Sequence, residues 1–140
     1  MLYVDTSVLV ALLTQERKTS DVIKWYGSCK QDLASSHWCV TEFASALGLK
    51  QKTGQLTKAQ AQASWTKFER LCQQDLQLLS NAAIHFYDAA LLAIDTAINV
   101  RAGDALHLAS ATANKATGLV SLDVGLLKSA KLLKLKPIAL

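Results

Sequence analysis

Short apolar runs alternate along the chain with longer segments in which apolar residues recur at helical spacing. The runs have the length and composition of buried strands. They lie at residues 2–4, 33–36, 76–79 and 119–122, and a last one begins at the only proline, Pro137. Strands that alternate with helices are typical of a parallel sheet covered by helices on both faces. The pattern therefore predicts one α/β domain over residues 1–140, with a parallel sheet of about five strands.

The two longest helical patterns are adjacent and predict a helical hairpin over about residues 37–74. Thr57 and Gln60, which follow the turn between them, have the spacing of a capping box, in which two side chains satisfy free backbone N–H groups at a helix start. In the second helix the apolar residues recur at intervals of four, three and four, which places them on one stripe. The stripe consists of Ala61, Trp65, Phe68 and Cys72.

The helix expected after residues 76–79 has an apolar stripe of its own. Its members recur every three or four residues, and we expect them to be buried. They are Ala83, Tyr87, Ala90, Ile94 and Ile98. The segment 99–103 interrupts this pattern, and Asp104 is expected to begin a further apolar helix that continues to about Ala113.

Composition restricts the class of protein. Half of the residues are apolar (51%), but no uninterrupted apolar run approaches the roughly 20 residues that a membrane span requires. The first residues carry no basic segment and include Asp5, so no signal peptide is expected. The three cysteines show no Cys-x-x-Cys spacing, which favours reduced thiols and a cytoplasmic protein.

The formal net charge is +4, and the basic residues are unevenly distributed. Between residues 105 and 140 the only acid is Asp123, whereas the same segment holds Lys115, Lys128, Lys131, Lys134 and Lys136. Lysines on solvated helix faces are common, so the charge by itself is weak evidence. It does fit a polyanionic partner such as a nucleic acid.

Four acidic residues stand where carboxylates are unusual. Asp5 and Asp123 each follow directly after a predicted strand, so in a parallel sheet both lie at its carboxyl edge, where ligands bind in open α/β folds. Glu42 lies one turn into the first helix of the hairpin among uncharged neighbours, and Asp104 opens an otherwise uncharged helix start. Acids in such surroundings are usually paired or bind a metal.

Each acid also has an ordinary structural explanation. Asp5, Asp104 and Asp123 have the positions of helix N-caps, and Glu42 would be half-exposed. That explanation has to be invoked for every acid on the same side of the sheet, whereas one metal site accounts for all of them. Carboxylate oxygens without cysteine or clustered histidine suit Mg²⁺ or Mn²⁺ better than zinc.

Several stretches of the chain resemble the PIN-domain nucleases, and specifically the VapC-type toxins of bacterial toxin–antitoxin pairs. The resemblance spans nearly the whole chain and is most specific at residues 101–109, Arg-Ala-Gly-Asp-Ala-Leu-His-Leu-Ala. Its other parts are Val4-Asp5-Thr6-Ser7, Glu42 and Ser121-Leu122-Asp123. At the last motif such toxins often carry Thr-x-Asp followed by polar residues, whereas a serine precedes and Val-Gly follows here.

The resemblance implies a metal-dependent endoribonuclease, a homodimer held inactive by a cognate antitoxin protein, and RNA products with 5′-phosphate and 3′-hydroxyl ends. The residues that would hold Mg²⁺ or Mn²⁺ and activate a water against the RNA are Asp5, Glu42, Asp104 and Asp123. The residues expected to hydrogen-bond these carboxylates and fix their rotamers are Ser7, Thr6 and Ser121.

Two further polar residues are weaker candidates. Arg101 fits a phosphate contact, or a brace for the carboxylates, about as well as it fits a surface ion pair. His107 lies one turn after Asp104 and is more typical of a core residue, or of a hydrogen-bond partner to a metal ligand, than of a ligand itself.

Other functions fit the sequence less well. A housekeeping PIN nuclease of RNA processing would use the same residues, although the small size favours a toxin. A short upstream reading frame with a DNA-binding start would decide between these two. A non-catalytic RNA-binding module would be expected to lack some of the acids, and all are present. A phosphatase with an aspartyl nucleophile would need Asp-x-Asp at the first corner, where Ser7 stands instead.

Overall fold

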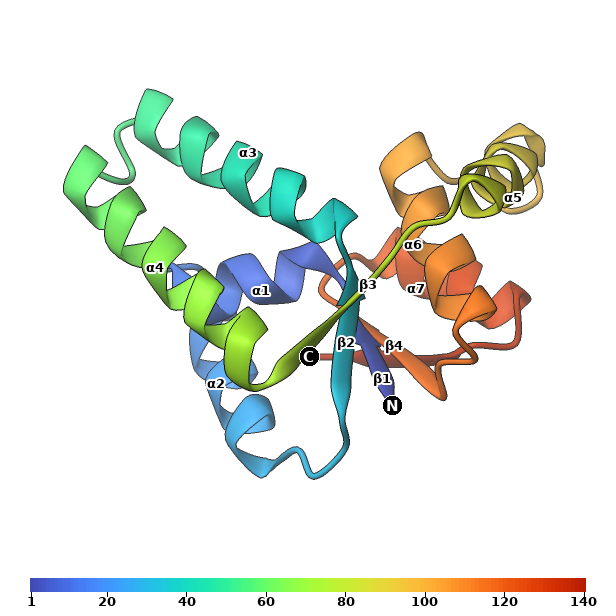
Figure 1. Cartoon of the computed structure of the whole chain (residues 1–140), viewed down its shortest axis with the longest axis horizontal. Helices are drawn as coiled ribbons and strands as arrows, with labels where there is room; N and C mark the ends of the chain where they lie inside the picture. Colours follow the sequence, from blue (N-terminus) through green and yellow to red (C-terminus); the bar gives the residue numbers. More distant parts are fainter.

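A five-stranded parallel sheet lies at the centre of the computed structural model, which describes residues 1–140 (Figure 1). The strands are β1 (Leu2–Val4), β2 (Leu33–Ser36), β3 (Leu76–Leu79), β4 (Gly118–Ser121) and β5 (Lys136–Ala139). The helices are α1 (Thr6–Leu13), α2 (Thr19–Ser28), α3 (Trp38–Lys52), α4 (Lys58–Gln74), α5 (Ala83–Ile94), α6 (Ala102–Ala113) and α7 (Val124–Leu132). The predicted α/β class and the parallel pairing of the strands are confirmed.

The strand order is β3-β2-β1-β4-β5, so β1 is the central strand. From β1 the chain builds β2 and β3 on one side, and then crosses to build β4 and β5 on the other. The ends of β1 and β4 therefore flank a topological switch point, which is where open α/β sheets bind their ligands. Asp5 lies at this point, and its backbone N–H donates to the carbonyl of Val120 at 3.0 Å.

The two faces of the sheet pack against different helices because successive strand residues point to opposite sides. In β1, Leu2 and Val4 join an apolar cluster with residues of α1 to α4. Tyr3 points to the other face and belongs to a second cluster with residues of α6 and α7. The predicted covering of both faces by helices is thus confirmed.

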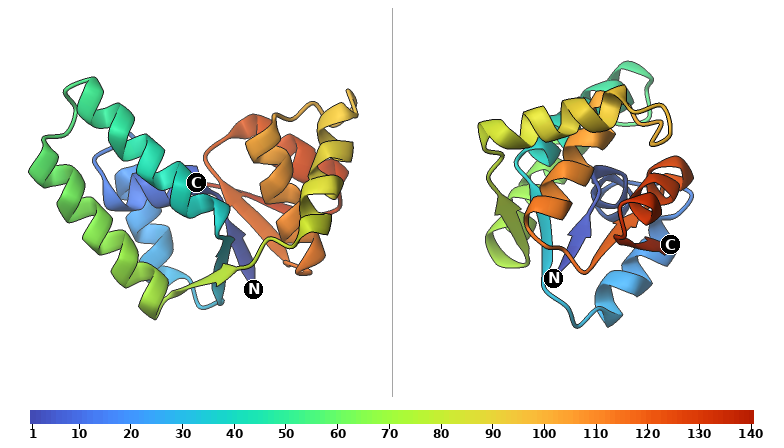
Figure 2. Two further views of the ribbon diagram at one scale, coloured as in Figure 1. Left: turned by 45° about the horizontal axis from the view of Figure 1, so that its top comes forward. Right: turned by 90° about the vertical axis from the view of Figure 1, so that its right-hand side faces the viewer.

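The predicted hairpin is present as α3 and α4, which project to one side of the sheet (Figures 1 and 2). The capping box of Thr57 and Gln60 forms at the start of α4 as expected. Aromatic stacking joins the two helices, with 4.4 Å between the ring centroids of Phe43 and Phe68. This packing fixes α3, which carries Glu42, relative to α4.

Helix α5 corrects the sequence prediction. The expected buried stripe is largely exposed, with Tyr87 at 72% and Ile94 at 75% accessible, and Ala89 is the one buried residue of the helix. The reason is that α5 packs chiefly against α6 at the far side of the domain rather than against the sheet (Figure 2). A regular stripe shows that a helix has an apolar face, but it does not show whether other parts of the same chain bury that face.

The next helix also begins earlier than expected. Helix α6 starts at Ala102 with Arg101 at the N-cap position, so Asp104 lies inside the first turn and does not cap the helix.

No helix of the structure combines the length and apolarity that a membrane crossing requires.

Candidate active site

One pocket at the carboxyl edge of the sheet, with a volume of about 470 Å³, brings together all four acids singled out by the sequence. They are Asp5, Glu42, Asp104 and Asp123. Each comes from a different segment of the chain: the end of β1, the first turns of α3, the first turn of α6, and the end of β4. The topology places Asp5 and Asp123 together, because they follow adjacent parallel strands at the switch point, and the packing of α3 and α6 brings Glu42 and Asp104 to the same pocket.

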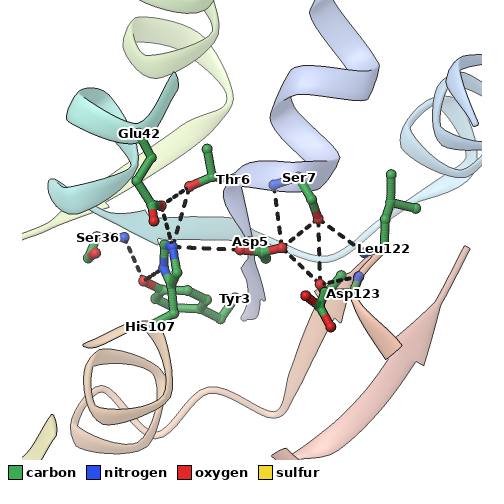
Figure 3. Close-up of polar contacts among 10 residues, drawn as sticks. Tyr3, Asp5, Thr6, Ser7, Ser36, Glu42, His107, Leu122 and Asp123 are labelled. Carbon is green, nitrogen blue, oxygen red and sulfur yellow. Dashed lines mark hydrogen bonds and ion pairs between the residues drawn. The ribbon is translucent and has the colours of Figure 1, made fainter. Parts of the chain in front are cut away.

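Asp5 is buried and held in one orientation by hydroxyl groups. Its Oδ2 accepts hydrogen bonds from Ser7 Oγ at 2.5 Å and Ser121 Oγ at 2.8 Å (Figure 3). Ser7 Oγ in turn accepts from the backbone N–H of Leu122 at 3.1 Å, which ties the network to the end of β4. The other oxygen, Oδ1, faces His107 Nε2 at 3.6 Å. The predicted contacts of Ser7 and Ser121 with a carboxylate are therefore present.

Glu42 is held by two partners on neighbouring elements. Its Oε2 accepts from Thr6 Oγ1 at 2.5 Å and from His107 Nε2 at 2.6 Å (Figure 3). His107 Nδ1 shares a hydrogen bond of 2.9 Å with the Tyr3 hydroxyl, which also accepts from the backbone N–H of Ser36 at 3.1 Å. A continuous chain of hydrogen bonds thus runs from β2 through β1 and α6 to Glu42 on α3.

The pair of Glu42 and His107 carries opposite charges at neutral pH. Burial disfavours the charged imidazole, but the hydrogen bond to Glu42 and the charges of Asp5 and Glu42 outweigh it and raise the pKa of His107 to about 10. Burial also opposes the Glu42 carboxylate, yet the hydrogen bond and charge of His107 lower the pKa of Glu42. His107 is thus a buried cation that compensates part of the negative charge of the pocket.

Asp104 and Asp123 are held less tightly. Asp123 caps α7, its Oδ1 accepting from the backbone N–H of Leu126 at 3.0 Å, so the structural explanation for this acid is also correct. Asp104 has no side-chain hydrogen bond to the protein. Burial, together with the charges of Asp5 and Asp123, raises its pKa. The surroundings of Asp104 thus disfavour its ionised form.

The donor set of the pocket fits a hard divalent cation, because every acidic ligand in it is a carboxylate and no cysteine lines it. The raised pKa of Asp104 also favours a bound cation, because the negative charges of the other acids act on Asp104 more strongly than the positive charge of His107. The acids do not, however, form a ready-made group of three metal ligands. The site therefore offers oxygen ligands around one pocket rather than a closed metal cage.

The site includes residues that the sequence reasoning underrated. Gly103 lets α6 approach α3, since a Cβ at this position would lie 3.0 Å from Glu42 Oε1 and 3.3 Å from Trp38 Nε1. Gly103 and His107 both belong to residues 101–109, the most specific stretch of the family resemblance, and this was the sequence signal that pointed to them. Arg101, by contrast, is exposed and does not line the pocket, whereas Arg17 does.

Comparisons with known proteins agree with this architecture. The family model of the PIN domain matches residues 2–132. Among curated proteins, none matches the sequence significantly.

Solved structures share the fold at low sequence identity. VapC20 of Mycobacterium tuberculosis, described as a sarcin-ricin loop cleaving toxin, is 12% identical, with a TM-score of 0.66 over 85% of this chain and 87% of its own. FitAcB of Neisseria gonorrhoeae is 17% identical, with a TM-score of 0.69 over 99% and 96%. VapBC2 of Rickettsia felis, bound to a DNA fragment from its promoter, is 14% identical, with a TM-score of 0.67 over 99% and 98%.

At these sequence identities the structural neighbours support the fold and nothing more. The family model, by contrast, covers nearly the whole chain, including the segments that carry all four acids. The chain belongs to the PIN-domain family.

Proposed function

We propose that this protein is a metal-dependent endoribonuclease that acts as the toxin of a toxin–antitoxin pair. The observation that carries the proposal is the pocket at the switch point of the sheet, which all four acids line: Asp5, Glu42, Asp104 and Asp123. Their place at the carboxyl edge of a PIN-domain sheet supports hydrolysis of a nucleic acid.

The residues that would hold the cation, Mg²⁺ or Mn²⁺, are Asp5, Asp104, Glu42 and Asp123. When bound, such an ion lowers the pKa of a water and neutralises charge on a phosphate, which is the chemistry that phosphodiester hydrolysis needs. The protein's own part is orientation. Hydrogen bonds from Ser7 and Ser121 hold Asp5, and those from Thr6 and His107 hold Glu42.

RNA is the proposed substrate. The family resemblance motivates it, and the net charge of +4 is compatible with a polyanion. By the same resemblance the products carry 5′-phosphate and 3′-hydroxyl ends. Arg101 remains a weaker candidate for a phosphate contact, because it is exposed and lies outside the pocket.

The enzymatic proposal is tested with purified protein, labelled RNA and a matching single-stranded DNA. We expect RNA cleavage with Mg²⁺ or Mn²⁺, loss of cleavage in excess chelator, recovery when the ion is restored, and no activity in Asp104→Asn. Cleavage that persists in chelator would exclude the metal mechanism. Cleavage of the DNA alone would replace the proposed substrate.

The assembly is proposed on separate grounds. Four exposed apolar residues of α5, spaced three or four apart, share one face that this chain leaves uncovered: Ile84, Tyr87, Leu91 and Ile94. Such a face suits a homodimer. For the antitoxin, we propose a peptide that places an arginine or lysine against the acids of the pocket, which would imitate the cation. Several structural neighbours are toxin–antitoxin complexes, which supports such a partner.

The toxin role is tested by induced expression in bacteria. Growth should stop with the wild type, continue with Asp104→Asn, and resume when the neighbouring small gene product is expressed with it. Amide exchange should then show protection around Asp5 and Glu42. Arrest that Asp104→Asn reproduces would disprove the role of the nuclease site in toxicity.

A further inference from the structure

The pocket of the four acids has a second end, which lies past the C-terminus of α1. There its wall is formed by Glu16, Arg17 and Lys18, from the connection between α1 and α2. Helix α1 has eight residues and is therefore about 12 Å long, so it spaces these charges well away from Asp5 at its start. The pocket is also lined by small and apolar side chains, namely Val10, Ala11, Ala46 and Leu122, and of these Val10 and Ala11 lie on α1 between its two ends.

The connection that carries these charges is held in place by hydrogen bonds of Thr19. Thr19 Oγ1 lies 2.8 Å from the carbonyl of Ala11 and 3.0 Å from that of Thr14, and it accepts from the backbone N–H of Glu16 at 2.8 Å. Arg17 lies within the turn that these bonds close. These hydrogen bonds therefore fix the backbone of Arg17 relative to the end of α1.

A buried lysine of α3 ties the same turn to the hairpin. Lys50 Nζ forms an ion pair with Glu16, and Gln55 Oε1 accepts a further hydrogen bond from it at 3.3 Å. The side chain of Lys50 is only 9% exposed, whereas that of Glu16 is 40% exposed. A buried ammonium needs such a partner, so the pair joins the turn firmly to α3.

Among the three charged residues at this end, only Arg17 lacks an ion-pair partner. Lys50 compensates Glu16, and Asp21 compensates Lys18 at 3.1 Å. Arg17 is exposed at the rim of the pocket and forms no ion pair with the protein. A guanidinium presents a planar fork of N–H donors that matches the oxygens of a phosphate.

We propose that Arg17 binds a backbone phosphate of the substrate RNA, a few nucleotides from the bond that is cut, while the strand lies along α1. The Lys50–Glu16 pair is a positioning element that holds Arg17 at this distance. The proposal rests on the proposed nuclease function and adds the path of the substrate. Small and apolar side chains along the path leave room for unpaired bases, and the one uncompensated cation stands at its end.

The test measures RNA binding without cleavage. A labelled single-stranded RNA of about ten nucleotides is titrated by fluorescence anisotropy against the Asp104→Asn protein, at several salt concentrations. Addition of Arg17→Gln should weaken binding roughly tenfold and lower the slope of log K against log salt by about 0.7, the value for one phosphate contact on a single strand. Arg70→Gln, which removes the same charge from α4 outside the pocket, is the matched control and should leave the slope unchanged.

The positioning pair is tested by a double-mutant cycle in the same background. Lys50→Met should lower the salt slope when Arg17 is present and have no further effect in Arg17→Gln, and Lys50→Arg should restore it. In the active protein, Lys50→Met should raise KM for RNA and leave kcat unchanged. A merely structural role of the pair would lower the melting temperature without this dependence on Arg17.

The outcomes separate this inference from the nuclease proposal. If the Asp104→Asn protein binds RNA and Arg17→Gln changes neither affinity nor salt slope, the inference is wrong and the nuclease proposal stands. Equal effects of Arg17→Gln and Arg70→Gln would also overturn it, because net charge would then explain both. If metal-dependent cleavage itself is absent, the proposed function fails first and the inference falls with it.

Discussion

Replacing His107 with Phe would remove the hydrogen bonds of the buried imidazole while keeping a ring of similar size. His107 is 1% exposed and contacts both Glu42 and the Tyr3 hydroxyl. The charge-assisted bond to Glu42 should contribute about 1.5–3 kcal/mol, and the bond to Tyr3 about 0.5–1.5 kcal/mol. Because the phenyl ring is somewhat larger than the imidazole, no cavity is left, and any overpacking adds to the loss. We therefore expect the free energy of unfolding to fall by about 2–4.5 kcal/mol.

For a domain of this size, 1 kcal/mol corresponds to roughly 3 °C in melting temperature, so the expected fall is roughly 6–14 °C. The pH dependence has a definite sign. Because the folded-state pKa of His107, about 10, lies above its unfolded value, its stabilisation is fully present below the unfolded value and is lost as the pH rises through about 10. The difference between wild type and His107→Phe should therefore shrink at high pH.

The assay is urea unfolding followed by circular dichroism, without metal, for wild type, His107→Phe, Glu42→Gln and the double mutant. If the two residues act as a pair, the coupling energy should be at least about 1.5 kcal/mol. Additive effects of the two substitutions, or a His107→Phe protein as stable as the wild type, would refute the reasoning. His107 would then be an ordinary core residue that happens to lie beside Glu42.

Three other predictions follow from the same site and from α5. Gly103→Ala should reduce RNA cleavage at least tenfold with little change in melting temperature, because its Cβ displaces Glu42; Gly48→Ala, where a Cβ meets nothing within 4 Å, is the control and should leave cleavage unchanged. Asp104→Asn without metal should melt at least as high as wild type at neutral pH, because the raised pKa of Asp104 makes its ionised form destabilising there. Millimolar Mg²⁺ should raise the melting temperature of the wild type more than that of Asp104→Asn, and equal shifts would contradict this. Leu91→Glu on the exposed face of α5 should convert a dimer into a folded monomer by light scattering, and an unchanged mass would place the dimer contact elsewhere.

Local signals determined much of this protein from the sequence. The corners at Asp5 and Asp123 are recognisable because a short apolar strand, an acid and a helix follow one another within a few residues. The hairpin of α3 and α4 is equally local, since its helical stripe and the capping box of Thr57 and Gln60 depend only on near neighbours. Parallel pairing then places the acids after β1 and β4 on one edge without further information.

Contacts between distant segments were decided only by the tertiary structure. Nothing in the spacing of residues pairs His107 with Glu42, 65 positions away, and nothing in the polar connection after α1 reveals that Arg17 shares a pocket with Asp5. The apolar stripe of α5 is equally regular whether it is buried or, as with Tyr87, left exposed. Periodicity defines which residues share a face of a helix or strand, but the order of the strands and the packing of the helices decide what that face meets.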